Sequence, residues 1–214
     1  LPGRLLQPLR LLRRAPEIGI VLSSFTTEKR TRKRLLAVPQ RIYSGRELLR
    51  LIARHVLPPT TSGLTLRKDL LEAIGGFDPA LKRMQDRDLV LRAAARAKGT
   101  TLAGVLWHKR WREDGISTPQ ATYIAALIAL VERHAIYQNE ELDARDYLIA
   151  RHLLALAKAM RFRQLKRDYS LAQEQLTPPL PPLPRLITRY RSSRRERHRL
   201  RQHLIAGVPA TGSI

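Results

Sequence analysis

The chain has 214 residues, with 40 Lys and Arg against 18 Asp and Glu and a formal net charge of +22. This length suits one sizeable core or a small domain with an appendage. The basic excess favours polyanionic partners such as nucleic acid, anionic lipid headgroups or phosphorylated substrates. The chain contains no cysteine, which excludes disulfides, thiolate metal sites and a cysteine nucleophile and fits a reducing compartment.

Membrane-spanning segments are not expected. A bilayer span needs roughly 18 to 20 apolar residues, and the most apolar stretch, Tyr123 to Val131, is too short. Arg and Pro interrupt the leucines of residues 1–14, so this stretch does not read as a signal peptide. We expect a cytoplasmic protein, with peripheral placement on the inner membrane surface as a further option.

Apolar patterning predicts an α/β arrangement in the first half of the chain. Strands are expected at residues 18–23, 33–38, 61–66 and 100–106, with a polar turn at 26–32. Helices are expected at 5–14, 45–55, 67–74 and 85–98. Ser44 has the character of an N-cap, with Glu47 at the capping-box position. Gly75 and Gly76 are expected to end one helix and Gly99 the next.

From residue 120 onward the pattern is all-helical. Helices are expected at 121–137, 143–162 and 164–175, followed by a stiff polyproline spacer at 177–184 and a basic tail. The tail is compatible with an exposed helix over 185–203, and 206–214 has the composition of a disordered end. The predicted divisions are 1–118, 119–176, 177–184 and 185–214.

The most informative block runs from Thr61 to Asp88 and reads TSGLTLRKDLLEAIGGFDPALKRMQDRD. It resembles the acceptor-side half of family-2 glycosyltransferases of the GT-A fold. In that family a Ser-Gly strand leads into an Arg-led helix, a Gly-Gly-Phe-Asp turn and, about ten residues later, an acidic motif that is often Glu-Asp. Gln85-Asp86 stands there in this sequence, so the usual Glu is replaced. The resemblance covers residues 18–117 and implies a partial GT-A-like, Rossmann-like sheet with flanking helices.

The resemblance implies that Asp86 is the catalytic base of an inverting sugar transfer. A sugar hydroxyl must lose its proton as it attacks the anomeric carbon, and a carboxylate within hydrogen-bond reach can accept that proton. A helix start should stabilise the charged form of this carboxylate. The alternative is that Asp86 is only an N-cap or first-turn acid.

Asp86, Arg87 and Asp88 resemble an Asp-x-Asp metal motif, but helix geometry argues against this reading. Residues i and i+2 of a helix point about 200° apart, so the two carboxylates are poorly placed to hold one ion. Asp88 is expected to orient Asp86 or to pair with a nearby Arg. The resemblance implies a divalent metal, Mg or Mn, bound mainly by residues upstream of Leu1 and outside this chain.

The resemblance also implies a set of substrate-binding residues. Ser62 and Gly63 are expected to face the acceptor, beside Gln85 and Asp88, with a plain strand start as the alternative for the first two. The loop of residues 107–117 is expected to close over the donor and acceptor. Its candidates are Trp107 or Trp111 for stacking on a sugar, Arg110 and Arg112 for the leaving diphosphate, and His108 for a metal or the diphosphate. The alternative for each is an ordinary surface loop.

These features predict a glycosyltransferase that moves a sugar from a nucleotide-sugar donor to a glycan or lipid-linked acceptor in cell-envelope or polysaccharide synthesis. One alternative is a non-catalytic truncated remnant. The other is a basic protein that binds nucleic acid or an anionic surface. The chain lacks zinc-ligand spacing, an aromatic ribonucleoprotein motif and a helix-turn-helix signature, so nucleic acid is the less favoured partner. The basic tail instead suggests peripheral contact with an anionic membrane.

Overall fold

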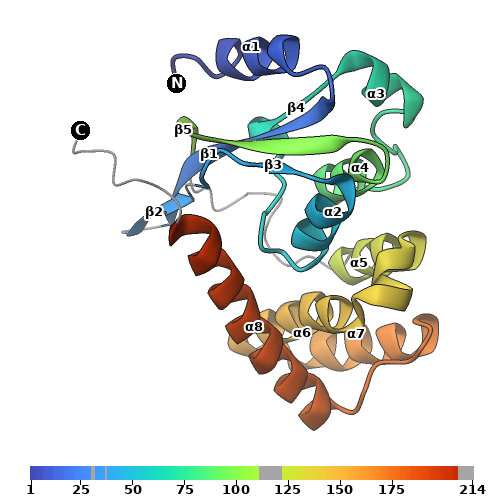
Figure 1. The fold of residues 1–214 in the computed structure, drawn as a ribbon. Helices are drawn as coiled ribbons and strands as arrows, with labels where there is room; N and C mark the ends of the chain where they lie inside the picture. Colours follow the sequence, from blue (N-terminus) through green and yellow to red (C-terminus); the bar gives the residue numbers. More distant parts are fainter. Residues whose placement is uncertain (30–31, 37, 111–121, 207–214) are drawn as a thin grey trace.

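The computed structural model describes residues 1–29, 32–36, 38–110 and 122–206. These residues form an α/β protein with a mixed β-sheet, followed by a group of helices (Figure 1). None of the helices in these ranges is long and apolar enough to cross a membrane.

The sheet is built around two long neighbouring strands. β1 (Ile18–Lys29) and β5 (Lys98–Lys109) run parallel, with Val21 opposite Thr100. The short strand β3 (Ile42–Tyr43) pairs antiparallel with β5. The other edge of β1 pairs antiparallel with two strands in succession, β4 (Leu64–Leu66) and β2 (Arg32–Leu36). Both long strands are thus hydrogen-bonded to neighbouring strands along both of their edges.

Helices cover both faces of this sheet (Figure 1). Val21 and Leu102 pack with Leu12 of α1 (Leu6–Arg14) on one face. Ile20 and Leu22 face the opposite side, where they join α2 (Gly45–Ala53) and α4 (Gln85–Ala94) in the main hydrophobic cluster. This alternation is the expected result of side chains pointing to opposite faces along a strand.

The main hydrophobic cluster continues without a break into the C-terminal helices. These are α5 (Tyr123–Arg133), a π-helical turn (Ile136–Glu140), α6 (Leu142–Lys158), α7 (Phe162–Gln175) and α8 (Leu183–Ala206). Residues from α5 to α8 belong to the same cluster as those of the sheet and of α2. The α/β part and the helical part therefore share one core.

The Pro-rich segment folds back onto the helices. Leu180 is buried, the Tyr169 hydroxyl donates to the Pro181 carbonyl (3.2 Å), and Arg145 donates to the Pro178 carbonyl (2.6 Å). α8 begins at Leu183, inside the stretch expected to be non-helical, because proline is tolerated in the first turn of a helix. The packing of this segment differs from that of an extended spacer.

Several element boundaries differ from the sequence prediction. β1 extends to Lys29, into the residues expected to form a polar turn, since it pairs with both β5 and β2 there. Thr61–Gly63 form a 3-10 turn, and only Leu64–Leu66 are extended. The prediction that Gly99 caps a helix is wrong: it lies in β5, where a Cβ would meet a Leu48 methyl at 2.4 Å. Glycine is required there by close helix–sheet packing.

The predicted N-cap of α2 and the predicted end of α3 are confirmed, although both helices are shorter than the expected 45–55 and 67–74. The Ser44 side chain accepts a hydrogen bond from the Glu47 backbone N–H (3.2 Å), so Ser44 is the N-cap of α2. α3 (Lys68–Ala73) is followed by Gly75 and Gly76. Their φ angles of +74° and +65° are favourable for glycine and costly for other residues, so they end the helix.

Candidate active site

The turn before α4 is fixed at several points. Asp78 follows the two left-handed glycines and pairs with Arg133 of α5. Met84, the N-cap of α4, has φ +63°, an uncommon conformation for a residue other than glycine. These constraints set the direction in which the first turn of α4 presents its side chains.

Asp86 lies in the first turn of α4, partly exposed. Its Oδ1 accepts a hydrogen bond from the Arg87 backbone N–H (2.8 Å). Burial raises the pKa of the Asp86 carboxyl, and the Arg87 N–H and the charges of Arg87 and Lys109 oppose that rise only in part. The sequence predicted the opposite direction from the helix dipole, so desolvation outweighs the helix start here. A carboxylate with a raised pKa is a stronger proton acceptor.

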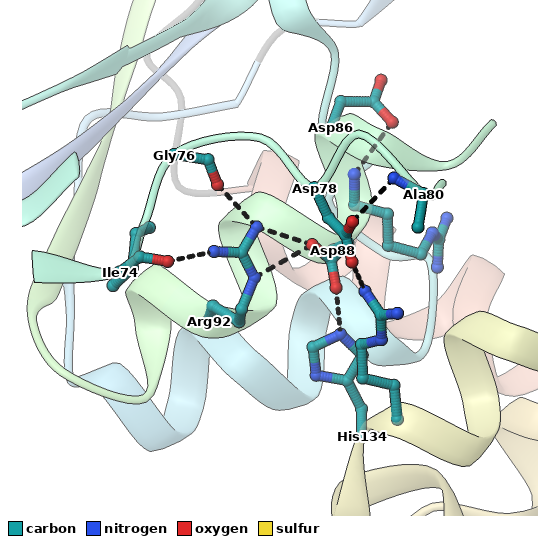
Figure 2. A network of polar contacts seen from close by, with 10 residues as sticks. Ile74, Gly76, Asp78, Ala80, Asp86, Asp88, Arg92 and His134 are labelled. Atoms are coloured by element: carbon teal, nitrogen blue, oxygen red, sulfur yellow. Dashed lines mark hydrogen bonds and ion pairs between the residues drawn. The ribbon is translucent and has the colours of Figure 1, made fainter. Parts of the chain in front are cut away.

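Asp88 points away from Asp86 and into the protein, as Figure 2 shows. It is fully buried. Its Oδ2 accepts two hydrogen bonds from Arg92 (2.6 and 2.9 Å), and its Oδ1 lies 3.0 Å from His134 Nε2. These partners lower the pKa of Asp88 against the opposing effect of burial.

The expectation that Asp88 pairs with a nearby Arg is confirmed. Arg92 also donates to the carbonyl oxygens of Ile74 and Gly76 (2.5 and 2.7 Å), which ties α4 to the end of α3. Asp88 therefore has a structural position, with both oxygens turned away from the surface on which Asp86 lies.

The first turn of α4 lies near the end of β5 because the chain reverses between these elements. α4 ends at Ala94 and β5 begins at Lys98. A ten-residue helix is about 15 Å long, so its start lies alongside the later residues of the returning strand. Lys109, the last residue of β5, is accordingly close enough for its charge to act on Asp86. The sequence prediction missed Lys109, although it stands between His108 and Arg110.

Trp107 and Gly63 are in contact. A Cβ on Gly63 would lie 2.7 Å from the indole Nε1 of Trp107. The close approach expected at Gly63 is therefore made by Trp107. The Trp107 ring stacks on Phe25 at a centroid distance of 4.3 Å, and its Nε1 has no hydrogen-bond partner among the described residues. One face of Trp107 is thus already covered.

Ser62 is exposed in the same 3-10 turn. Its carbonyl oxygen accepts a hydrogen bond from Arg4 Nε (2.6 Å), and Arg4 also donates to the Leu64 carbonyl and the Thr65 hydroxyl (3.1 and 3.2 Å). Arg4 thus fastens the N-terminal segment to the 3-10 turn that contains Ser62 and to β4, which follows it. Nothing in the sequence pattern indicated this contact.

His108 lies on β5 beside two polar residues of β1. Its Nδ1 lies 2.7 Å from the Thr26 hydroxyl, and its Nε2 lies 3.3 Å from Glu28 Oε2. This pair supplies two potential metal ligands. Within the described residues, no group of three or more His, Asp or Glu side chains is placed to hold a metal ion.

The remaining candidates are Gln85, Arg110, Trp111 and Arg112. Gln85 is the first residue of α4 and is partly exposed. Arg110 is exposed directly after β5. Trp111 and Arg112 lie outside the described residues.

Comparison with protein-family models and with curated proteins finds no match for this chain.

Proposed function

We propose that this chain is the acceptor-side part of a glycosyltransferase with a partial GT-A fold, and that Asp86 is its catalytic base. The observation that carries the proposal is the environment of Asp86. Burial raises the pKa of its carboxyl group. The carboxylate bonds to the Arg87 N–H and takes no part in the hydrogen-bond network of Asp88, Arg92 and His134 (Figure 2). Burying a carboxylate without neutralising it costs free energy, which is typical of groups held for a reaction.

In the proposed reaction Asp86 accepts the proton of an acceptor hydroxyl as its oxygen attacks the anomeric carbon of a nucleotide sugar. The carbon–oxygen bond to the diphosphate breaks on the opposite side, with inversion. Asp86 needs strong basicity, which burial supports, and a fixed direction, which the turn anchored by Asp78 and Met84 supports. Lys109 adds a positive charge beside this carboxylate.

The proposal assigns the leaving diphosphate to Arg110 and Arg112 and the sugars to the surface near Ser62, Gln85 and Trp107. The donor is a nucleotide sugar, and the acceptor is a glycan or a lipid-linked glycan. The metal that such enzymes use is not assigned to described residues, because His108 and Glu28 alone do not form a metal site.

The test is sugar transfer by the full-length protein with Asp86→Asn. Loss of a general base lowers the rate by about a hundredfold or more. Asp69→Asn is a matched control, because Asp69 also lies in a first helical turn and its Oδ1 also accepts a bond from the next backbone N–H (2.8 Å). An undiminished rate in Asp86→Asn rejects the base. Absence of turnover in the unmodified full-length protein, over a panel of nucleotide sugars, favours the non-catalytic remnant.

A second proposal, peripheral binding to an anionic membrane, has one observation in its favour. α8 exposes a set of arginines that have no ion-pair partner in the part of the chain that the structure describes: Arg185, Arg191, Arg194, Arg195 and Arg199. Each basic residue near an anionic surface contributes about 1 kcal/mol. Co-sedimentation with phosphatidylglycerol vesicles, but not with neutral phosphatidylcholine vesicles, is the expected result. Equal recovery with both would count against it.

A further inference from the structure

His55 lies where four helices meet, and arginines from three of them reach it. Arg87 of α4 contacts the ring Nδ1 of His55. Arg151 Nη1 of α6 lies 2.9 Å from its Nε2. Arg197 Nη1 of α8 donates to its carbonyl oxygen (3.4 Å). Arg201 lies one turn further along α8, and its charge also acts on His55. We call Arg87, Arg151, Arg197 and Arg201 the arginine cluster.

The hydrogen bonds of His55 cannot all be satisfied by the arginine cluster. A neutral imidazole has one N–H and one lone pair, and a guanidinium group has only donors. Arg87 and Arg151 approach different ring nitrogens, so one of them faces an N–H. Protonation of His55 would turn both contacts into donor against donor. Arg87 also donates to the Ile52 carbonyl oxygen (3.0 Å), so the exposed Arg151 is the member that can take an acceptor from outside the chain.

Opposite charge is scarce at the arginine cluster. Within the described residues, no carboxylate forms a salt bridge with any of its four members, although Arg87 is only 5% exposed. The charge of Asp86 acts on Arg87 without a salt bridge. The neighbouring Arg54, by contrast, pairs with Glu141 and Glu196 (2.7 and 2.9 Å). Burying positive charge without a counterion is costly. The cluster thus has an excess of charge that an anion would neutralise.

Arg197 is held in place while one of its donors stays free. Its guanidinium carbon lies 5.4 Å from the ring centroid of Tyr147, on the ring face. Its Nε is buried and has no hydrogen-bond partner in the described part of the chain. Arg151 is exposed, so the cluster is open to solvent on the α6 side.

We propose that the arginine cluster beside His55 is a binding site for the phosphate group of a ligand. Phosphate oxygens accept hydrogen bonds from several guanidinium groups at once, and arginine matches them better than lysine does. An anion next to Arg151 and Arg197 supplies both the missing acceptor and the missing negative charge. The proposed site is made by the junction of α2, α4, α6 and α8, and it does not depend on sugar transfer by Asp86.

The test is calorimetric titration of the full chain with inorganic phosphate at low ionic strength. We expect saturable binding, weakened about tenfold or more in Arg151→Gln and in Arg197→Gln, because each removes a charge-assisted hydrogen bond. Arg163→Gln is the matched control. It removes the same charge from an exposed position of α7, and we expect less than about a twofold change. Arg151 is exposed, so its variant should fold even if Arg197→Gln does not, and circular dichroism checks this.

Two results would overturn the proposal: no saturable phosphate binding to the unmodified chain, or an equal loss of affinity in Arg163→Gln. The same titration with vesicles identifies the source of the phosphate group. Binding to phosphatidic acid vesicles that Arg151→Gln abolishes assigns the site to a lipid headgroup. Binding of inorganic phosphate without such vesicle binding assigns it to a soluble phosphate ester.

Discussion

Two acids in the first turn of α4 have opposite environments. Asp86 is partly exposed, and burial raises its pKa without a side-chain partner to offset the cost. Asp88 is fully buried, and Arg92 and His134 lower its pKa. The two residues differ because i and i+2 lie on different sides of a helix. Their substitutions should therefore have opposite effects on stability.

Asp86→Asn should stabilise the protein while reducing its activity. A raised pKa means that the charged carboxylate is less favourable in the folded chain than in water, so removing the charge should help at neutral pH. The asparagine oxygen can still accept the Arg87 N–H. We expect a gain of about 0.5–1 kcal/mol in unfolding free energy, measured by urea denaturation, as is common at functional sites. A loss would indicate that Asp86 is a stabilising first-turn acid.

Asp88→Asn should destabilise the protein by about 3 kcal/mol, because it breaks a buried charge pair and leaves Arg92 without its counterion. The same urea titration measures it, and Asp69→Asn is again the control, with an expected change within about 0.5 kcal/mol. A change in Asp88→Asn as small as in the control would show that the network of Figure 2 adds little stability.

For single residues, the sequence predicted that Asp86 and Asp88 point in different directions, but not how the surroundings shift the pKa of each. The helical period alone was enough to predict that Asp86 and Asp88 lie on different sides of α4. The direction of the Asp86 pKa depends on the packing around the first turn of α4, and the position of Lys109 depends on the returning strand. Neither is encoded in the local pattern. His134 is 46 residues from Asp88 in the chain, so no local pattern linked the two.

Among the elements, α2 and α4 approach each other closely through a glycine. A Cβ on Gly45 would lie 2.3 Å from the carbonyl oxygen of Ala94. Gly45→Ala should therefore cost about 1–3 kcal/mol through overpacking, although alanine is the better helix former. Thermal unfolding measures the effect. Gly104→Ala is the control, since its Cβ would meet only the Gln7 side-chain oxygen at 3.3 Å and Leu106 at 3.6 Å. Equal melting temperatures for the two variants would contradict the close approach.

Element types with local signals were predictable, and elements that depend on distant pairing were not. The N-cap at Ser44 and the helix end at Gly75 and Gly76 depend only on residues next to each other in the sequence, so they could be predicted. β1 is twelve residues long because β2, β4 and β5 all pair with it, and a pattern over six residues could not show this. Leu183 and Pro184 were read as part of a spacer because proline disfavours helix interiors, whereas here they begin α8.

For the molecule as a whole, the positive charge is unevenly compensated. Some arginines of α8 and of the end of α2 have carboxylate partners, such as Arg54 with Glu141 and Arg189 with Asp146. The arginine cluster around His55 has none among the described residues. Composition gave the net charge of +22 but not this distribution, because it arises where helices distant in sequence meet.

The uncompensated charge around His55 should make stability depend on pH. Burial is the largest cause, and the charges of Arg87 on α4, Arg151 on α6, and Arg197 and Arg201 on α8 add to it, so the pKa of His55 falls well below 6.5. Below pH 6.5 the unfolded chain then binds a proton at His55 that the folded chain does not. The stability contributed by His55 is complete above that pH and is lost as the pH falls toward the depressed folded pKa.

We therefore expect unfolding free energy to decrease between about pH 7.5 and about pH 5, and His55→Asn to flatten that decrease. Asparagine is a suitable replacement because it tolerates the positive φ of +56° at this position. The measurement is urea denaturation in buffer free of phosphate, since an anion bound at the arginine cluster would offset the charges that lower the pKa of His55. An identical pH dependence in His55→Asn would show that other groups cause it. A shallower dependence in the unmodified protein after phosphate is added would link this titration to the proposed phosphate site.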